Sequence, residues 1–224
     1  MKRSKRYIEI AKLVDSKKIY SVEEAISLAK KTSTSKFDSS IDVAIKLNLD
    51  TTKADQQLRG TITLPHYFGK TQKILVIADT ITDKEAKDLG VDYGGTDKIN
   101  EIKSGWLDFD LIITTAKFMP ELSKLGKILG PKGLMPNPKL GTVSTDVIKT
   151  VKEFKKGKSN YRTDTYGNIH MKIGRSSATD QQIVENYNTL LDFIKSKRPS
   201  TVKGDYIQNI TISSAMGPAI KVAR

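Results

Sequence analysis

The spacing of apolar residues changes twice along this chain, and that change constrains the fold more than any other feature. Residues 41–47 alternate apolar and polar side chains, which is typical of a strand with one buried and one solvated face. Residues 74–78 and 110–115 instead contain continuous apolar runs, typical of strands in a parallel sheet that is covered on both faces. Alternation returns in residues 168–173 and 206–213. The pattern therefore predicts two kinds of sheet, the second in the middle of the chain.

Helical segments follow the same division. Amphipathic helices are expected near the two ends of the chain, at residues 4–14, 21–31 and 179–194. Capping boxes, Ser21 with Glu24 and Thr179 with Gln182, indicate where the last two begin. In the middle we expect a short strand at residues 91–93 and helices at 84–89, 96–103, 121–129 and from a cap at Ser144 or Thr145 onward. Strands that alternate with short helices favour a small parallel sheet, Rossmann-like in layout.

We therefore expect an α/β and α+β protein of two domains. Residues 1–66 and 160–224 would form a discontinuous α+β domain, and residues 67–159 an inserted Rossmann-like βαβ domain, because insertions are tolerated at exposed loops. Gly69 and Gly157 lie at the two joins. We expect a hinge there, since glycine can absorb changes in φ and ψ.

The charge of the chain indicates the kind of partner. A formal net charge of +13 at pH 7 favours a polyanion, with nucleic acid preferred over anionic lipid or acidic protein. The two terminal segments together carry +9 and the middle segment +4. The arginines lie only in the terminal segments: Arg3, Arg6, Arg59, Arg162, Arg175, Arg198 and Arg224. Because the guanidinium fork matches phosphates and base edges, we expect the main nucleic-acid surface on the discontinuous domain.

The absence of cysteine excludes a secreted disulfide scaffold and a cysteine nucleophile. We expect neither a secretory leader nor a membrane span, and hence a cytoplasmic protein without a membrane partner.

Catalytic motifs are missing from the sequence. No Gly-x-Gly occurs, and the glycines at P-loop spacing, Gly90 and Gly95, are followed by Thr96 where that motif needs lysine. His66 and His170 are not at ligand spacing. Asp108 and Asp110 are either a solvated strand end or a site for Mg²⁺. We expect no enzyme, no catalytic residue, no cofactor and no metal site, which leaves RNA binding ahead of a nucleotide-dependent enzyme or a basic DNA-binding protein.

Three short segments have both a structural and a functional interpretation. The loop at residues 130–139 is either a stiff connection or a rigid support that presents lysines to phosphates. Phe37, beside Lys36, either closes a helix–strand corner in the core or contacts a ribose or base. The turn at residues 213–218 either ends a strand or brings the main chain close to a sugar–phosphate edge.

Five segments together resemble one known family. They are residues 36–38 (KFD), 55–66 (DQQLRGTITLPH), 105–110 (GWLDFD), 125–139 (LGKILGPKGLMPNPK) and 216–218 (MGP). In them the chain resembles the bacterial form of the large ribosomal subunit protein one family, the ribosomal stalk proteins, over about residues 5–222. The proline-rich loop and residues 59–66 are the specific parts of this resemblance.

The resemblance implies a structural protein of the large subunit, ribosome-bound and hinged, which binds 23S rRNA at the mobile stalk beside the tRNA exit site and contacts other large-subunit components. It also implies help in releasing deacylated tRNA and repression of translation of the protein's own mRNA. The implied rRNA-binding residues are Lys36, Phe37, Ser40, Asp42, Lys46, Asp164, Gly167, Met216 and Gly217.

A second set of cations, for tRNA or other secondary RNA contacts, comes from two loops and the helix before one of them: Lys53, Arg59, Lys124, Lys127, Lys132 and Lys139. The chain departs from the family at two points. Thr165 stands where a lysine usually follows the aspartate, and Ala215 stands where a threonine usually precedes the methionine. A phosphate contact and a hydroxyl contact are therefore not expected at these two positions.

Overall fold

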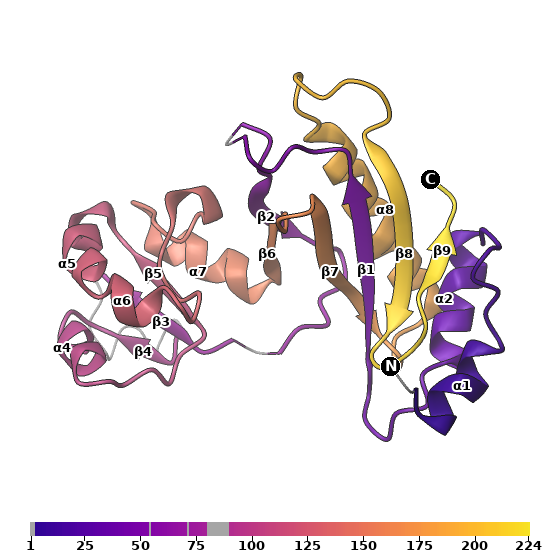
Figure 1. The fold of residues 1–224 in the computed structure, drawn as a ribbon. Helices are drawn as coiled ribbons and strands as arrows, with labels where there is room; N and C mark the ends of the chain where they lie inside the picture. The colour runs from indigo at the N-terminus through magenta and orange to yellow at the C-terminus, as the bar shows by residue number, and fades with distance from the viewer. Residues whose placement is uncertain (1–2, 54, 71, 80–89) are drawn as a thin grey trace. The chain divides into compact units, whose positions relative to one another are not determined.

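The computed structural model describes residues 3–53, 55–70, 72–79 and 90–224, which fall into two compact units (Figure 1). The first unit comprises Met1–Phe68 and Asn160–Arg224, and the second comprises Gly69–Ser159. The helix expected at residues 84–89 lies outside the described residues. The structure confirms the expected mixture of α-helices and β-sheets.

The first unit is built on a four-stranded sheet of order β7-β1-β8-β9. Its strands are β1 (Ser40–Leu47), β7 (Asn168–Arg175), β8 (Ile207–Ser214) and β9 (Ile220–Val222). β1 is antiparallel to both neighbours, with Val43 opposite Met171 on one side and Ile212 on the other. Segments from opposite ends of the sequence thus lie side by side (Figure 1).

Three helices accompany this sheet: α1 (Lys5–Ala11), α2 (Val22–Lys31) and α8 (Asp180–Ser196). The expected caps are present, since Ser21 accepts from the Glu24 amide and Thr179 forms a full capping box with Gln182. α2 and α8 pack on the face of the sheet that carries its apolar residues. The other sheet face is consequently polar.

A two-stranded ribbon, β2 (Arg59–Thr63) with β6 (Lys158–Arg162), belongs to the same core through Ile62 and Tyr161. The Thr163 amide donates to the Leu58 carbonyl over 2.9 Å, and a Cβ on Gly60 would lie 2.9 Å from the Tyr161 hydroxyl. From the first contact to the second, the residue number rises along β2 and falls along β6. The two strands are therefore antiparallel. The pattern analysis did not predict β6 or β9.

The second unit contains a parallel sheet of order β4-β3-β5, formed by β3 (Ile74–Ile77), β4 (Tyr93–Gly94) and β5 (Leu111–Thr114). Ile74 and Val76 pack with α7 (Val147–Lys155), whereas Leu75 and Ile77 pack with the helices on the other face. Both faces are therefore covered, as the continuous apolar run of β3 predicts.

The remaining helical elements of the second unit are α4 (Lys98–Lys103), η1 (Ala116–Phe118), α5 (Met119–Lys124), α6 (Gly126–Leu129) and η2 (Pro138–Leu140). The single helix expected at residues 121–129 is wrong, because a tight turn from the Leu125 amide to the Leu122 carbonyl separates α5 from α6. The expected cap of α7 at Ser144 or Thr145 is also wrong, since the Asp146 carboxylate accepts from the Lys149 amide.

The first unit extends to Phe68, two residues beyond the predicted boundary, because the Phe68 carbonyl accepts from Lys172 Nζ (2.8 Å) and Arg175 Nε (3.0 Å). Gly69 is the first residue of the second unit, and Gly157, with φ 97°, lies two residues before its end. The hinge at these glycines and the independent, Rossmann-like character of the insertion stay predictions. Within the described ranges, no helix is both long and apolar enough to cross a membrane.

Candidate nucleic-acid interface

The face of the four-stranded sheet opposite α2 and α8 is lined by polar side chains. Along β1, Ser40, Asp42 and Lys46 alternate with buried Ile41, Val43, Ile45 and Leu47. Opposite them, Asp42 pairs with Lys172 and Ser213, and Lys46 with Asn168 and Asn209. We call this surface the polar sheet face: Ser40, Asp42, Lys46, Asn168, His170, Lys172, Asn209, Thr211 and Ser213. It offers hydrogen-bond donors, acceptors and cations together, as an RNA backbone requires.

At the start of β1, the loop that carries Lys36 and Phe37 is held by Asp38. The Asp38 carboxylate accepts from Ser176 Oγ (2.8 Å), Ser177 Oγ (2.9 Å), the Ser177 amide (3.1 Å) and Arg175 (3.4 Å). The Ser176 hydroxyl is the main reason why the pKa of Asp38 falls to about 2. Asp38 therefore stays ionised and anchors the loop to the segment that joins β7 to α8.

Phe37 is 58% exposed, although it is one of the larger apolar side chains of the unit. The interpretation of this ring as a core residue is therefore wrong. Lys36 is also exposed and has no ion-pair or hydrogen-bond partner within the described ranges. An aromatic ring and a free cation thus stand next to each other on an anchored loop, which suits a base or ribose beside a phosphate.

The turn between β8 and β9 lies beside the same end of β1, because the Ala215 amide donates to the Ser40 carbonyl over 2.9 Å. Met216 is 69% exposed and has φ 63°, a left-handed conformation that is costly for its side chain. A Cβ on Gly217 would lie only 2.2 Å from Ser214 Oγ. This turn is consequently closed tightly enough to bring main-chain groups close to a ligand.

The other end of the polar sheet face carries the turn from β6 to β7, which includes Asp164 and Gly167. Asp164 accepts from the amides of Tyr166 (2.9 Å) and Asn168 (2.7 Å) and from the Asn168 side chain (2.8 Å). Burial opposes ionisation of Asp164, but these donors outweigh it and lower its pKa to about 2. Lys46 donates its ammonium to the Tyr166 carbonyl. Lys46 and Asp164 thus shape the turn as well as lining the surface.

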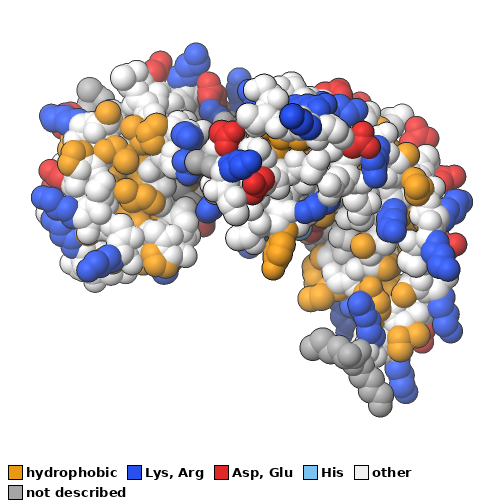
Figure 2. All heavy atoms as spheres, turned by 45° about the horizontal axis from the view of Figure 1, so that its top comes forward, with side chains coloured by type: hydrophobic (Ala, Val, Ile, Leu, Met, Phe, Trp, Pro, Cys, Tyr) orange, Lys and Arg blue, Asp and Glu red, His pale blue; other side chains and the backbone are white. Residues whose placement is uncertain are grey.

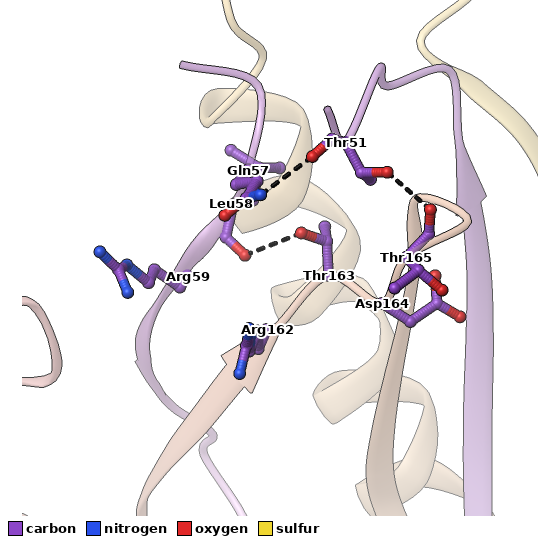
Figure 3. Close-up of a pocket in the computed structure, with 8 residues that line it drawn as sticks. All are labelled: Thr51, Gln57, Leu58, Arg59, Arg162, Thr163, Asp164 and Thr165. Atoms are coloured by element: carbon purple, nitrogen blue, oxygen red, sulfur yellow. Dashed lines mark hydrogen bonds between the residues drawn. The ribbon is translucent and has the colours of Figure 1, made fainter. Parts of the chain in front are cut away.

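A small pocket of about 90 Å³ joins this turn to the β2–β6 ribbon (Figure 3). Figure 3 shows Arg59 and Arg162 on the facing strands, with Thr51 bonded to the Thr165 carbonyl over 2.6 Å. Neither guanidinium has an ion-pair or hydrogen-bond partner in the part of the chain that the structure describes. Two uncompensated cations on adjacent strands repel each other. In Figure 3 the Arg59 side chain extends away from Thr51 and Thr165. Ionised Asp164 lines the pocket itself, so the two guanidinium groups suit a phosphate at the edge of the ribbon.

The other predicted cations are not among the residues that line this pocket. Lys53 forms an exposed ion pair with Asp50, whose carboxylate is 3.6 Å from its ammonium. The predicted lysines of the second unit are all exposed: Lys124 on α5, Lys127 on α6, Lys132 in the following loop and Lys139 in η2. Figure 2 shows Lys and Arg side chains on the surfaces of both units, interspersed with acidic ones.

The proline-rich loop is held from within. Asn137 accepts from the Lys139 amide (2.8 Å), and its own amide donates to Thr142 Oγ1 (2.7 Å). Leu134 and Met135 pack on the apolar core beneath α5 and α6. These contacts hold the second half of the loop in place, and Lys132 and Lys139 are exposed to solvent.

The carboxylates at the entry to β5 are engaged by the protein. Asp108 pairs with Lys73 Nζ at 2.7 Å, and Asp110 accepts from the Lys73 amide over 3.0 Å. These contacts favour the strand-end interpretation over a site for Mg²⁺. Among the described residues, no three His, Asp or Glu side chains are grouped so that they could hold a metal ion.

The structure thus brings Lys36, Phe37, Ser40, Asp42, Met216 and Gly217 to one end of the polar sheet face and Lys46, Asp164 and Gly167 to the other. Sequence reasoning assigned no specific role to two contributors. Arg162 belongs to the pocket, but its pairing with Arg59 spans a hundred residues and leaves no local signal. Asp38 anchors the loop that carries Phe37. The resemblance includes residues 36–38, but it assigned no role to the Asp38 carboxylate.

Comparisons with known proteins show which proteins this chain is similar to. Residues 29–218 match the sequence profile described as the "Ribosomal protein L1p/L10e family". The chain is 64% identical over 209 residues to the large ribosomal subunit protein uL1 of Mycoplasmoides gallisepticum, covering 93% of this chain and 92% of that protein. It is 55% identical over 222 residues to the protein of the same name from Mycoplasma genitalium, covering 99% and 97%. To that of Malacoplasma penetrans it is 61% identical, covering 93% of this chain and 62% of the other.

Proposed function

The chain belongs to the ribosomal protein L1 family, and from this premise we propose that it is a structural component of the large ribosomal subunit that binds 23S rRNA at the stalk. The protein acts in the cytoplasm, bound to the ribosome beside other large-subunit components. It has no catalytic role.

The polar sheet face, with a closed turn at each end, is the observation that carries this proposal. β1 is eight residues long, so the two ends are about 25 Å apart, which is enough to follow several nucleotides of an RNA backbone. Phe37 and Met216 offer apolar contacts at one end, and Lys46 offers a cation towards the other. Asp42 accepts hydrogen bonds, which suits a 2′-hydroxyl or a base amino group.

The binding experiment uses the full chain, a transcribed 23S rRNA stalk fragment and a scrambled RNA of equal length. We expect selective binding of the stalk fragment. With about six phosphates neutralised, the slope of log affinity against log salt is about −4 to −6. Equal affinity for both RNAs, or an affinity that salt does not change, would contradict the proposal.

The pocket between Arg59 and Arg162 favours a second function on the same unit, namely transient binding of deacylated tRNA at the exit site. Both guanidinium groups are unpaired among the described residues, so each can donate to a phosphate, whereas the Thr51 and Thr163 hydroxyls already donate to the Thr165 and Leu58 carbonyls. Lys53 adds a cation on the same unit. The exposed lysines of α5, α6 and the proline-rich loop are the cations that the second unit offers to tRNA. The chain also represses translation of its own mRNA, by binding an RNA that resembles the ribosomal site through the polar sheet face.

Charge reversal separates the two surfaces. Arg59→Glu with Arg162→Glu should weaken binding of free deacylated tRNA at least tenfold and leave the stalk-fragment affinity within a few-fold, because the pocket lies beside the main surface. Arg3→Glu with Arg6→Glu is the control of matched charge. If the control weakens tRNA binding equally, net charge rather than the pocket holds the tRNA.

A further inference from the structure

The turn from β6 to β7 exposes an aromatic ring that neither the fold nor the proposed contacts use. Tyr166 is 76% exposed, the highest value among the large apolar and aromatic side chains of the described residues. Its hydroxyl has no hydrogen-bond partner within those ranges. Turns of this kind favour Gly, Asn, Asp or Ser, which need no packing partner. A tyrosine here adds nothing to the core.

The backbone beneath this ring is held from several sides. The Gly167 amide donates to the Asp164 carbonyl over 3.2 Å, and Gly167 has φ 77°, which completes a tight hairpin turn. The Tyr166 amide donates to Asp164, and the Tyr166 carbonyl accepts from Lys46. The ring is therefore presented from a fixed main chain, and little backbone entropy would be lost when a ligand binds.

The groups around the turn indicate the chemistry of that ligand. Lys46 places its ammonium on the Tyr166 carbonyl, and Arg162 lines the adjoining pocket. The ionised Asp164 carboxylate also lies in this turn, where it accepts from the Tyr166 and Asn168 amides. Cations beside an exposed aromatic ring are the combination that binds an unpaired nucleotide, with the phosphate on the cation and the base stacked on the ring. An apolar protein partner would instead need further exposed hydrophobic side chains beside the ring. Among the large hydrophobic side chains that are exposed in the described ranges, Tyr166 is the only one in this turn.

We propose that Tyr166 is a stacking platform for one unpaired base of the bound rRNA. The inference rests on the proposed rRNA-binding function and deepens it. It assigns the β6–β7 end of the polar sheet face to an unstacked nucleotide, in a loop or bulge of the RNA. Because every base has an aromatic face, the contact tolerates different bases but requires that the base be free of its helix.

The first test compares affinities for the stalk fragment in the full chain. Tyr166→Ala should weaken binding about 5- to 150-fold, the range expected for the loss of one base-stacking contact. Tyr166→Phe, which keeps the ring, should stay within about twofold of the original chain. Ile19→Ala removes another exposed apolar side chain (65% exposed) and should change nothing.

The second test reports stacking directly. The chain has one tryptophan, Trp106, which is replaced by phenylalanine so that Tyr166→Trp supplies the only indole signal. Stalk RNA should quench this emission, whereas inorganic polyphosphate, which has no bases, should not. Emission that the RNA leaves unchanged overturns the proposal, as does full affinity of Tyr166→Ala. If the original chain fails to bind the fragment at all, the rRNA-binding function itself has failed.

Discussion

At the residue scale, Phe37 decides how the first end of the polar sheet face works. Its ring is 58% exposed on a loop whose main chain is anchored by Asp38. Phe37→Ala should therefore lower stalk-fragment affinity by about 1–3 kcal/mol, the value for one aromatic contact to a base or sugar. The melting temperature should change little, because no core contact is lost. Calorimetric titration and thermal melting measure both, and Leu13→Ala, 58% exposed on another surface, is the control.

Asp38 makes the same loop sensitive to acid. Its pKa is about 2 in the folded chain and near 4 when unfolded, so below pH 4 the unfolded chain binds the extra proton. The stabilisation is therefore fully present above about pH 4 and is lost as the pH falls through 2. Asp38→Asn should flatten the decline in melting temperature between pH 4 and pH 2. It should also weaken stalk-RNA binding at pH 7, by freeing the loop that carries Phe37. An unchanged pH profile would show that the carboxylate is not the anchor.

At the element scale, α5, α6 and the proline-rich segment after them carry four exposed lysines of the second unit. We expect the quadruple change of Lys124, Lys127, Lys132 and Lys139 to glutamine to leave stalk-fragment affinity within about tenfold, while it weakens binding of deacylated tRNA. Filter binding with each RNA measures the two effects. The matched control changes Lys103, Lys149, Lys152 and Lys156, which are exposed on α4, α7 and the α7 C-terminus. A loss of stalk binding as large as that of Phe37→Ala would place part of the primary surface on the second unit.

The elements differ in how far the sequence could predict them. The alternation of apolar and polar residues predicts β1, β7 and β8. A continuous apolar run predicts β3, and alternate residues of this strand pack into two different cores. β6 could not be found this way, since Tyr161 is its only buried residue and its pairing partner β2 lies a hundred residues away. β9, three residues long, exists because it pairs with β8. The pocket depends on the β2–β6 pairing, so tertiary structure, rather than local pattern, creates it.

At the scale of the whole molecule, the apolar core of the first unit determines whether that unit can stand alone. Every residue of the cluster that joins β1, β7, β8, β9, α2 and α8 comes from Met1–Phe68 or Asn160–Arg224. About 130 residues remain when Gly69–Ser159 is removed, a length that commonly folds independently. Phe68 must be kept, because its carbonyl satisfies Lys172 and Arg175.

We therefore expect a chain in which Phe68 is joined to Asn160 by a short glycine–serine linker to melt cooperatively. Its affinity for the stalk fragment should be within about tenfold of that of the full chain, and it should still reject the scrambled RNA, because every residue of the polar sheet face is retained. The part of the tRNA binding that depends on the lysines of α5 and α6 should be lost.

The complementary fragment, Gly69–Ser159 alone, should fold around its own parallel sheet, which is covered on both faces, but should show no preference for the stalk RNA. A product that does not fold, or one that folds without discriminating the two RNAs, would mean that the terminal segments need the insertion. In that case the division into two independent domains, with a hinge at Gly69 and Gly157, would be wrong.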